Sequence, residues 1–84
     1  MVKVRKRDGR IEEFMKSKII NGCEKAGATA KEAAKVAEEV AVEVTRFTIV
    51  TTDEIAKFVA DSLEKINKKA ADAYKNFREE KSSK

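Results

Sequence analysis

Basic side chains crowd the start of this sequence and give it its most evident capacity for chemistry. They are Lys3, Arg5, Lys6, Arg7, Arg10, Lys16 and Lys18. Several cationic donors that converge can hold a polyphosphate, because each phosphate oxygen that loses hydration needs a charged partner in return. Glu12 is a carboxylate in this basic setting, and it could accept a hydrogen bond from a hydroxyl or amino group of a ligand. The alternative is that these charges form an ordinary solvated face.

A β-hairpin would carry most of these charges. Residues 2–7 alternate apolar and basic side chains, which predicts a strand. Asp8 and Gly9 follow and predict a tight turn, and residues 10–14 would form the returning strand. Lys18 would then lie in the first turn of a helix, where unpaired backbone N–H groups favour an anion. The hairpin tip could reach the same anion from the other side.

Two registers of this hairpin are possible. A two-residue turn would pair Arg7 with Arg10. A three-residue turn, with Gly9 in the left-handed conformation, would pair Lys6 with Arg10. We favour the three-residue turn, because it gathers the apolar side chains on one face and a slip of one residue would separate them. That face would hold Val2, Val4, Lys6, Glu12 and Phe14.

The rest of the chain predicts helices around one further strand. Ser17 would be the N-cap of a first helix that ends at a left-handed Gly27. The expected apolar stripe of this helix is Ile19, Ile20, Cys23 and Ala26. Thr29 and Glu32 predict a capping box for a second helix that ends near Arg46. Its expected buried residues are Ala33, Val36, Ala37, Val40 and Val44.

Residues 47–50 are β-branched or aromatic and predict a third strand. Thr51 and Glu54 predict a second capping box and a third helix. Its expected inward residues are Ile55, Phe58, Val59, Leu63 and Ile66. A break at Asn67 would separate it from a last helix. That helix would turn Ala70, Ala71, Tyr74 and Phe77 inward.

The expected fold class is therefore α+β: a three-stranded antiparallel or mixed sheet packed by four helices, in the order ββααβαα. We expect a single domain over residues 1–80 and a polar tail over residues 81–84. Cys23, on the apolar stripe, is expected to be a small core residue rather than a reactive thiol. Tyr74 and Phe77, which face the same way, are expected to pack in the core.

Composition limits the possible functions. The chain has 84 residues, enough for one domain with a thin core. Its net charge of +4 suits a small anionic ligand and would also suit weak contact with nucleic acid. With no histidine and one cysteine, this chain offers no Ser–His or Cys–His catalytic pair, and we expect neither zinc nor a disulfide. We predict a non-enzyme without a prosthetic group. Since no apolar run is long enough for a membrane span, we expect a cytoplasmic protein.

A known family shares the basic pattern. Residues 4–14 have the sequence VRKRDGRIEEF and are followed by Lys18 and Ile19. This pattern resembles the opening of the ATP-cone domain, the allosteric module of ribonucleotide reductases. The module also occurs in the repressor of ribonucleotide reductase genes and in some archaeal kinases. The likeness continues through residues 51–55 (TTDEI) and 71–78 (ADAYKNFR), and it covers nearly the whole chain.

The resemblance implies binding of ATP or dATP between the hairpin and the helices, and it allows Mg²⁺ to accompany the triphosphate. By position, the implied nucleotide-binding residues are Val4, Lys6, Arg7, Glu12, Lys18, Thr52 and Arg78. The cationic members would hold the phosphates, and Val4 would pack on the base or sugar. Glu12 and Thr52 would make polar contacts with the nucleoside. Binding would then alter self-association into a homo-oligomer or docking to a larger regulated protein.

Two alternative functions remain open. The first is a basic nucleic-acid-binding module, although no aromatic residue is interleaved with the basic ones. The second is a degenerate cone that has lost its ligand and acts as a protein-interaction scaffold. Met15 stands where the family commonly has aspartate or asparagine, and Ala56 stands where some reductase members have histidine. These two departures keep the scaffold alternative open.

Overall fold

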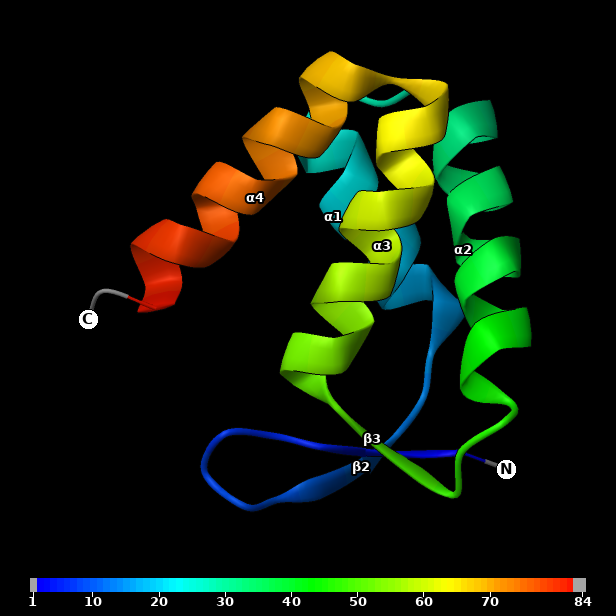
Figure 1. The fold of residues 1–84 in the computed structure, drawn as a ribbon, viewed down its shortest axis with the longest axis vertical. Helices are drawn as coiled ribbons and strands as arrows, with labels where there is room; N and C mark the ends of the chain where they lie inside the picture. Colours follow the sequence, from blue (N-terminus) through cyan, green and yellow to red (C-terminus); the bar gives the residue numbers. More distant parts are fainter. Residues whose placement is uncertain (1, 83–84) are drawn as a thin grey trace.

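The computed structural model describes the backbone of residues 2–82 and the side chains of residues 2–76. Along the chain the elements follow the predicted order ββααβαα (Figure 1). They are β1 (Lys3–Arg5), β2 (Ile11–Glu13), α1 (Lys16–Lys25), α2 (Ala30–Val44), β3 (Ile49–Thr51), α3 (Thr52–Ile66) and α4 (Lys68–Ser82). The helices lie together on one side of the small sheet (Figure 1). The predicted α+β class is therefore confirmed.

The sheet is mixed, with β1 at its centre. Its strand order is β2-β1-β3, in which β1 runs antiparallel to β2 and parallel to β3. Val4 of β1 lies opposite Glu12 in β2 and Val50 in β3. Because side chains alternate along a strand, these three residues share one face of the sheet. Val4 and Val50 are buried there, so this is the face that the helices cover.

The hairpin turn has the three-residue form. The backbone N–H of Lys6 donates to the carbonyl of Arg10 at 2.8 Å, and that of Gly9 donates to the carbonyl of Lys6 at 2.9 Å. Gly9 has φ +92°, which favours glycine. The carboxylate of Asp8 accepts from the backbone N–H of Arg10 at 3.1 Å. The predicted register is confirmed, and with it the face that carries Val4.

The start of α1 differs from the prediction. Met15 is the N-cap, in an extended conformation and without a side-chain capping hydrogen bond. Phe14 still continues the hairpin pairing beyond the strands, since its N–H donates to the carbonyl of Val2, just before β1, at 3.4 Å. The chain therefore stays extended through Met15 and turns helical at Lys16. The prediction of Ser17 as N-cap is wrong, because Ser17 already lies inside the first turn.

The end of α1 was predicted from Gly27 and is confirmed. Gly27 has φ +109°, and its N–H donates to the carbonyl of Glu24 at 3.0 Å. The N–H of Ala28 donates to the carbonyl of Cys23, also at 3.0 Å. This pair of hydrogen bonds is a Schellman motif, in which the buried residues Ala28 and Cys23 supply the usual apolar contact.

Both predicted capping boxes are present. In α2, the Thr29 hydroxyl accepts from the N–H of Glu32 at 3.1 Å, and the Glu32 carboxylate accepts from the N–H of Thr29 at 3.0 Å. In α3, Thr51 and Glu54 make the same exchange at 3.1 and 2.9 Å. Thr51 is also the last residue of β3. The strand therefore runs directly into the helix, and the capping box fixes the start of α3 against the sheet.

The third strand lies further along than predicted. It spans Ile49–Thr51 rather than residues 47–50. Phe47 lies before the strand, where its ring centroid is 6.2 Å from that of Phe58 on α3. A long-range aromatic contact thus outweighs the strand preference of Phe47, which the local sequence alone does not reveal.

The apolar core lies between the helices and above the sheet. The predicted residues of α2 are all buried: Ala33, Val36, Ala37, Val40 and Val44. Leu63 and Val59 of α3 and Cys23 of α1 are 0% exposed. The predicted Ala70 and Ala71 of α4 are buried as well, whereas the side chain of Phe77 lies outside the described residues. Helix α4 extends to Ser82, and the predicted division at residue 80 stays a prediction.

Asn67 connects α3 to α4, at the predicted break. Its side-chain amide donates to the Glu32 carboxylate at 3.1 Å. Its side-chain oxygen accepts from the N–H of Ala70 at 3.1 Å and so caps α4. Glu32 therefore serves two elements, because it closes the capping box of α2 and holds this joint. The pKa of Glu32 is lowered, chiefly by the backbone N–H of Thr29 and then by Asn67.

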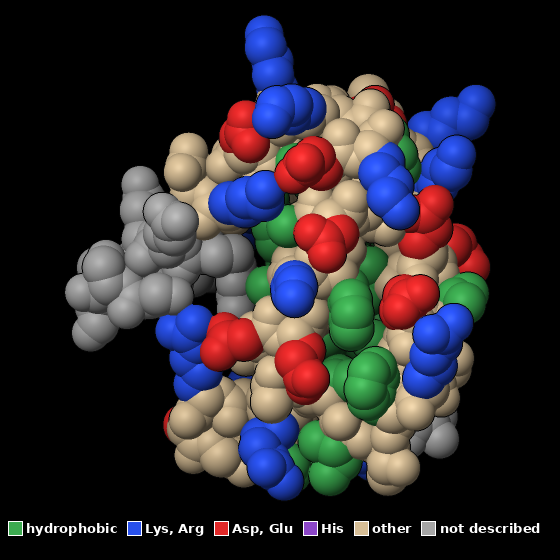
Figure 2. Space-filling model, in the orientation of Figure 1, with side chains coloured by type: hydrophobic (Ala, Val, Ile, Leu, Met, Phe, Trp, Pro, Cys, Tyr) green, Lys and Arg blue, Asp and Glu red, His purple; other side chains and the backbone are tan. Residues whose placement is uncertain are grey.

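The surface carries charges of both signs. On the face shown in Figure 2, apolar side chains gather near the sheet ends of α2 and α3. Exposed apolar residues at the adjoining ends of α2 and β3 include Val42, Phe47 and Ile49. Within the described residues, no helix is both long and apolar enough to cross a membrane.

Candidate functional site

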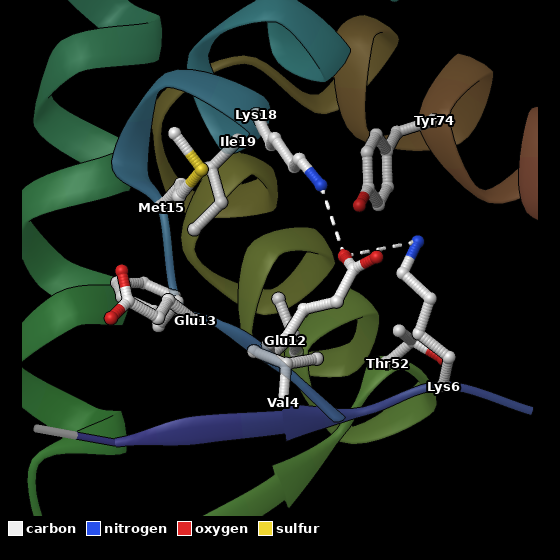
Figure 3. Close-up of a pocket in the computed structure, with 11 residues that line it drawn as sticks. Val4, Lys6, Glu12, Glu13, Met15, Lys18, Ile19, Thr52 and Tyr74 are labelled. Atoms are coloured by element: carbon white, nitrogen blue, oxygen red, sulfur yellow. Dashed lines mark hydrogen bonds and ion pairs between the residues drawn. The ribbon is translucent and has the colours of Figure 1, made fainter. Parts of the chain in front are cut away.

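A pocket of about 190 Å³ opens between the hairpin, the start of α1, the start of α3 and the middle of α4 (Figure 3). Six of its residues come from the hairpin or its exit, and the other five come from helices. It is lined by Val4, Lys6, Glu12, Glu13, Phe14, Met15, Lys18, Ile19, Thr52, Ile55 and Tyr74. Segments far apart in the sequence thus meet at one hollow.

Two predicted lysines meet at this pocket through one carboxylate. The Lys18 ammonium donates to Oε1 of Glu12 at 3.2 Å, and the Lys6 ammonium lies 3.5 Å from the same oxygen. Lys6 extends from the hairpin and Lys18 from α1, so they reach Glu12 from different sides (Figure 3). The Glu12 side chain is 34% exposed. The structure therefore brings two cations from separate elements to the mouth of one cavity.

The charge of Glu12 is stabilised by this arrangement. The hydrogen bond from Lys18 lowers the pKa of the Glu12 carboxyl, and the charge of Lys6 lowers it further. Partial desolvation acts in the opposite direction and is outweighed. Glu12 is consequently a carboxylate at neutral pH, and it neutralises part of the charge of both lysines.

The wall of the pocket is apolar. Val4 of β1 and Ile19 of α1 are 7% and 6% exposed, and Ile55 of α3 packs against the same core. Tyr74 of α4 packs partly against the core and also lines the pocket. Its ring approaches α1 closely, since a Cβ atom at Gly22 would lie 3.4 Å from Cε1 of Tyr74. The site therefore combines an apolar floor with a charged mouth.

Thr52, one of the expected site residues, lines the pocket. It is the first residue of α3 and is half-buried. Its position follows from Thr51, because the capping box turns the chain from β3 into the helix at this point. The Thr52 hydroxyl is a donor and acceptor of hydrogen bonds, which the apolar wall lacks.

The predicted arginines are placed differently. Arg7 is exposed and does not line the pocket. Its guanidinium donates to Oδ1 of Asp53, from Nη2 at 2.6 Å and from Nε at 3.2 Å. Asp53 lies in the first turn of α3, beside Thr52. The side chain of Arg78 lies outside the described residues.

The remaining basic residues of the first segment point elsewhere. Arg10 pairs with Asp8 at 2.7 Å, Lys3 with Glu13 at 3.7 Å, and Lys16 with Glu38 at 2.8 Å. None of these three basic residues lines the pocket. The charge cluster seen in the sequence thus contains two lysines that converge at the pocket, whereas Lys3, Arg7, Arg10 and Lys16 have carboxylate partners on the surface.

Several pocket residues were not predicted as site residues. They are Glu13, Phe14, Met15, Ile19, Ile55 and Tyr74. The predicted register places Phe14 on the face of Val4, so the pattern contains a signal for Phe14. Tyr74 was predicted to lie in the core, which is confirmed in part, because its ring packs on the core and also faces the pocket. No local signal connects Tyr74 with the hairpin.

Cys23 is a core residue, as predicted. It is 0% exposed, and burial raises the pKa of its thiol to about 11. Such a thiol is protonated at neutral pH and does not act as a nucleophile or metal ligand. Among residues 2–76, no three Cys, Asp or Glu side chains gather as a group that could hold a metal ion.

The fold and the pocket define a small α+β module that presents a charged mouth over an apolar floor. Residues 2–83 match the family model of the ATP cone domain, and the chain belongs to this family. Membership confirms the resemblance seen in the sequence. It points to a nucleotide-binding regulatory module and agrees with the prediction of a non-catalytic protein.

The chain is similar to two curated proteins, and the first of them supports this assignment. The chain is 39% identical over 84 residues to the transcriptional repressor NrdR of Thermosipho melanesiensis, in a match that covers 88% of this chain and 56% of the repressor. It is 62% identical over 39 residues to an uncharacterized protein of Archaeoglobus fulgidus, in a match that covers 46% of this chain and 83% of that protein. The chain thus spans little more than half the length of the repressor.

Proposed function

We propose that the chain is a sensor of adenine nucleotides that binds ATP or dATP in this pocket. The observation that carries the proposal is the convergence of Lys6 and Lys18, from two separate elements, at the mouth of an apolar cavity. A cavity of about 190 Å³ is smaller than the roughly 300–1,000 Å³ of common small-molecule sites. We therefore place the base or sugar inside, on Val4, and the phosphates at the open mouth.

The other predicted residues would complete the site. Thr52 and Glu12 would make polar contacts with the nucleoside. Arg7 would reach a phosphate only by exchanging its contact with Asp53. Arg78 would approach from the C-terminal side, and Mg²⁺ would accompany the triphosphate as a solvated counterion. Family membership favours an adenine base.

We further propose that binding changes self-association or docking to a larger protein. A ligand shifts an assembly equilibrium only by its different affinity for the two states. The pocket joins the hairpin to α4, so a nucleotide would bias the packing between these elements. Sedimentation velocity with and without ATP measures this effect directly. An unchanged distribution at saturating ATP would leave nucleotide binding in place and remove this coupling.

Titration calorimetry tests the binding itself, with ATP, dATP and GTP as ligands. We expect ATP and dATP to bind, and Lys18→Met to weaken ATP by roughly 10- to 100-fold through loss of a charge-assisted contact. Lys16→Met is the matched control, because Lys16 lies on the same helix but pairs with Glu38 away from the pocket. Equal effects of both substitutions, or no heat with wild type at millimolar nucleotide, would refute the proposal.

Nucleic-acid binding is a second candidate, and the similarity to a transcriptional repressor is the observation that favours it. It predicts affinity for labelled DNA or RNA that falls steeply with added salt. If the chain is instead a scaffold that has lost its ligand, we expect it to bind neither nucleotides nor nucleic acid. Saturable binding that prefers adenine over guanine distinguishes the sensor from both.

A further inference from the structure

We propose that Glu12 occupies the phosphate position of the pocket as an internal anion and thereby makes the site select nucleotides over inorganic polyphosphate. This inference rests on the proposed nucleotide site. The observation behind it is that one carboxylate oxygen, Oε1 of Glu12, contacts both Lys6 and Lys18.

The position of Glu12 is fixed by the fold rather than by its own flexibility. Glu12 is the central residue of β2 and lies directly opposite Val4. Its side chain therefore points to the helix-covered face, unlike that of Glu13, the next residue. In Figure 3, Glu13 is directed away from the two lysines, whereas Glu12 lies between them.

The same contact obstructs a phosphate. A phosphate oxygen that binds both lysines must take the place that Oε1 of Glu12 now holds, or share the lysines with it. The displaced carboxylate is only 34% exposed, so water replaces its lost partners incompletely. Binding of a bare polyphosphate consequently leaves one poorly compensated negative charge beside several others.

A nucleotide differs, because it brings hydrogen-bond donors with its phosphates. A ribose hydroxyl or an adenine amino group in the cavity can donate to the carboxylate that the lysines release. Inorganic tripolyphosphate carries a similar charge but brings no ribose hydroxyl and no amino group into the cavity. Glu12 thus disfavours the anion alone and is compensated only when a nucleoside accompanies it, which is selection against the wrong ligand.

Titration calorimetry with ATP and sodium tripolyphosphate at fixed ionic strength tests this inference. The Glu12→Gln substitution keeps the shape of the side chain and removes its charge. We expect Glu12→Gln to bind tripolyphosphate roughly five- to tenfold more tightly than wild type, since two partly exposed ion pairs no longer compete. The affinity of this variant for ATP should rise by a smaller factor or fall. Its preference for ATP over tripolyphosphate should therefore be smaller than that of wild type.

Glu38→Gln is the matched control. It changes the net charge by the same amount and also releases a lysine of α1, since Glu38 pairs with Lys16 at 2.8 Å, but neither residue lines the pocket. We expect Glu38→Gln to bind tripolyphosphate within about twofold of wild type, because a change of charge outside the pocket acts only through screened solvent. Denaturation of all three proteins checks that they are equally folded.

The outcomes separate this inference from the proposed function. If wild type binds ATP and Glu12→Gln gains no more tripolyphosphate affinity than Glu38→Gln, the inference fails and the nucleotide site stands. If wild type does not bind ATP but Glu12→Gln binds tripolyphosphate, the internal anion stands and the nucleotide function fails. If no protein binds either ligand, both fail.

Discussion

The helical core and the pocket use different physics for different purposes. The core side chains of α2 and α3, such as Val36 and Leu63, are fully buried and apolar. The charged pocket residues Lys6, Glu12 and Lys18 keep between 33% and 60% of their side-chain surface exposed. Burial of apolar area dominates folding free energy, whereas partly exposed ion pairs contribute little to it. Stability and the proposed ligand recognition should therefore be largely separable in this molecule.

The two regions share a narrow boundary. Val4 and Ile19 belong to the core and also form the pocket wall. Substitutions at these positions would change stability and binding together. Substitutions on either side of the boundary should change one property and spare the other, and the following predictions test that separation from the largest expected effect to the smallest.

Leu63→Ala should cause the largest loss of stability. Leu63 is 0% exposed and is the largest of the fully buried side chains, so its truncation loses apolar contacts and leaves a cavity. We expect the free energy of unfolding to fall by about 2–5 kcal/mol. Urea denaturation measures this loss. ATP affinity of the folded fraction should stay within about twofold of wild type, and a larger change would show that core and pocket are coupled.

Thr51→Ala and Thr29→Ala compare the two capping boxes. Each substitution removes a hydroxyl that caps a helix, and each should lower the free energy of unfolding by about 1 kcal/mol. Only Thr51 adjoins a pocket residue, Thr52, so only Thr51→Ala should also weaken ATP binding. Thermal denaturation and calorimetry on both variants give the two readouts. Equal binding by both variants would mean that the cap does not position the pocket.

The contact between Arg7 and Asp53 should matter little for folding. Both side chains are more than half exposed, so the coupling energy between them should be less than about 1 kcal/mol. A double-mutant cycle with Arg7→Ala and Asp53→Ala measures it by denaturation. Asp53→Ala should raise ATP affinity if Arg7 exchanges partners on binding. A coupling energy of several kcal/mol would instead make this contact part of the structural framework.

Acid should remove the smallest of these contributions to folding stability, which comes from the Glu12 carboxylate. Its pKa is lowered in the folded protein, so its stabilising effect is complete above the ordinary value of 4.5. The effect is lost as pH falls through the lowered pKa, because protonation ends the attraction to Lys6 and Lys18. The stabilities of wild type and Glu12→Gln should therefore converge below pH 4.5 and differ most at neutral pH. NMR titration of the Glu12 carboxyl checks the direction of the shift.

Features set by neighbouring residues could be predicted from the sequence. The hairpin register followed from Gly9 and the spacing of Val4 and Phe14, and it is the reason that Glu12 faces the helices. The Schellman motif at Gly27 and both capping boxes were equally local. The convergence of Lys6 and Lys18 at one pocket also followed, because only a short stretch of chain separates them.

Features set by long-range contacts could not be predicted in this way. The partner of Arg7 is Asp53, which lies 46 residues away. The start of β3 was misplaced because Phe47 contacts Phe58 on another element. The prediction of Ser17 as an N-cap was wrong for a different reason, because the hydrogen bond of Phe14 to Val2 sets where the helix can begin. Propensity is a weak guide wherever tertiary contacts compete with it.

The single-residue joint at Asn67 gives α4 the geometry of a lever. At about 1.5 Å of rise per residue, Tyr74 lies about 10 Å along the helix from the pivot and Ser82 about 22 Å. A tilt of α4 about Asn67 that moves Tyr74 by about 1 Å to admit a ligand would displace Ser82 by about 2 Å. Because Glu32 of α2 holds Asn67 by a hydrogen bond, Asn67 would stay in place while the rest of α4 tilts.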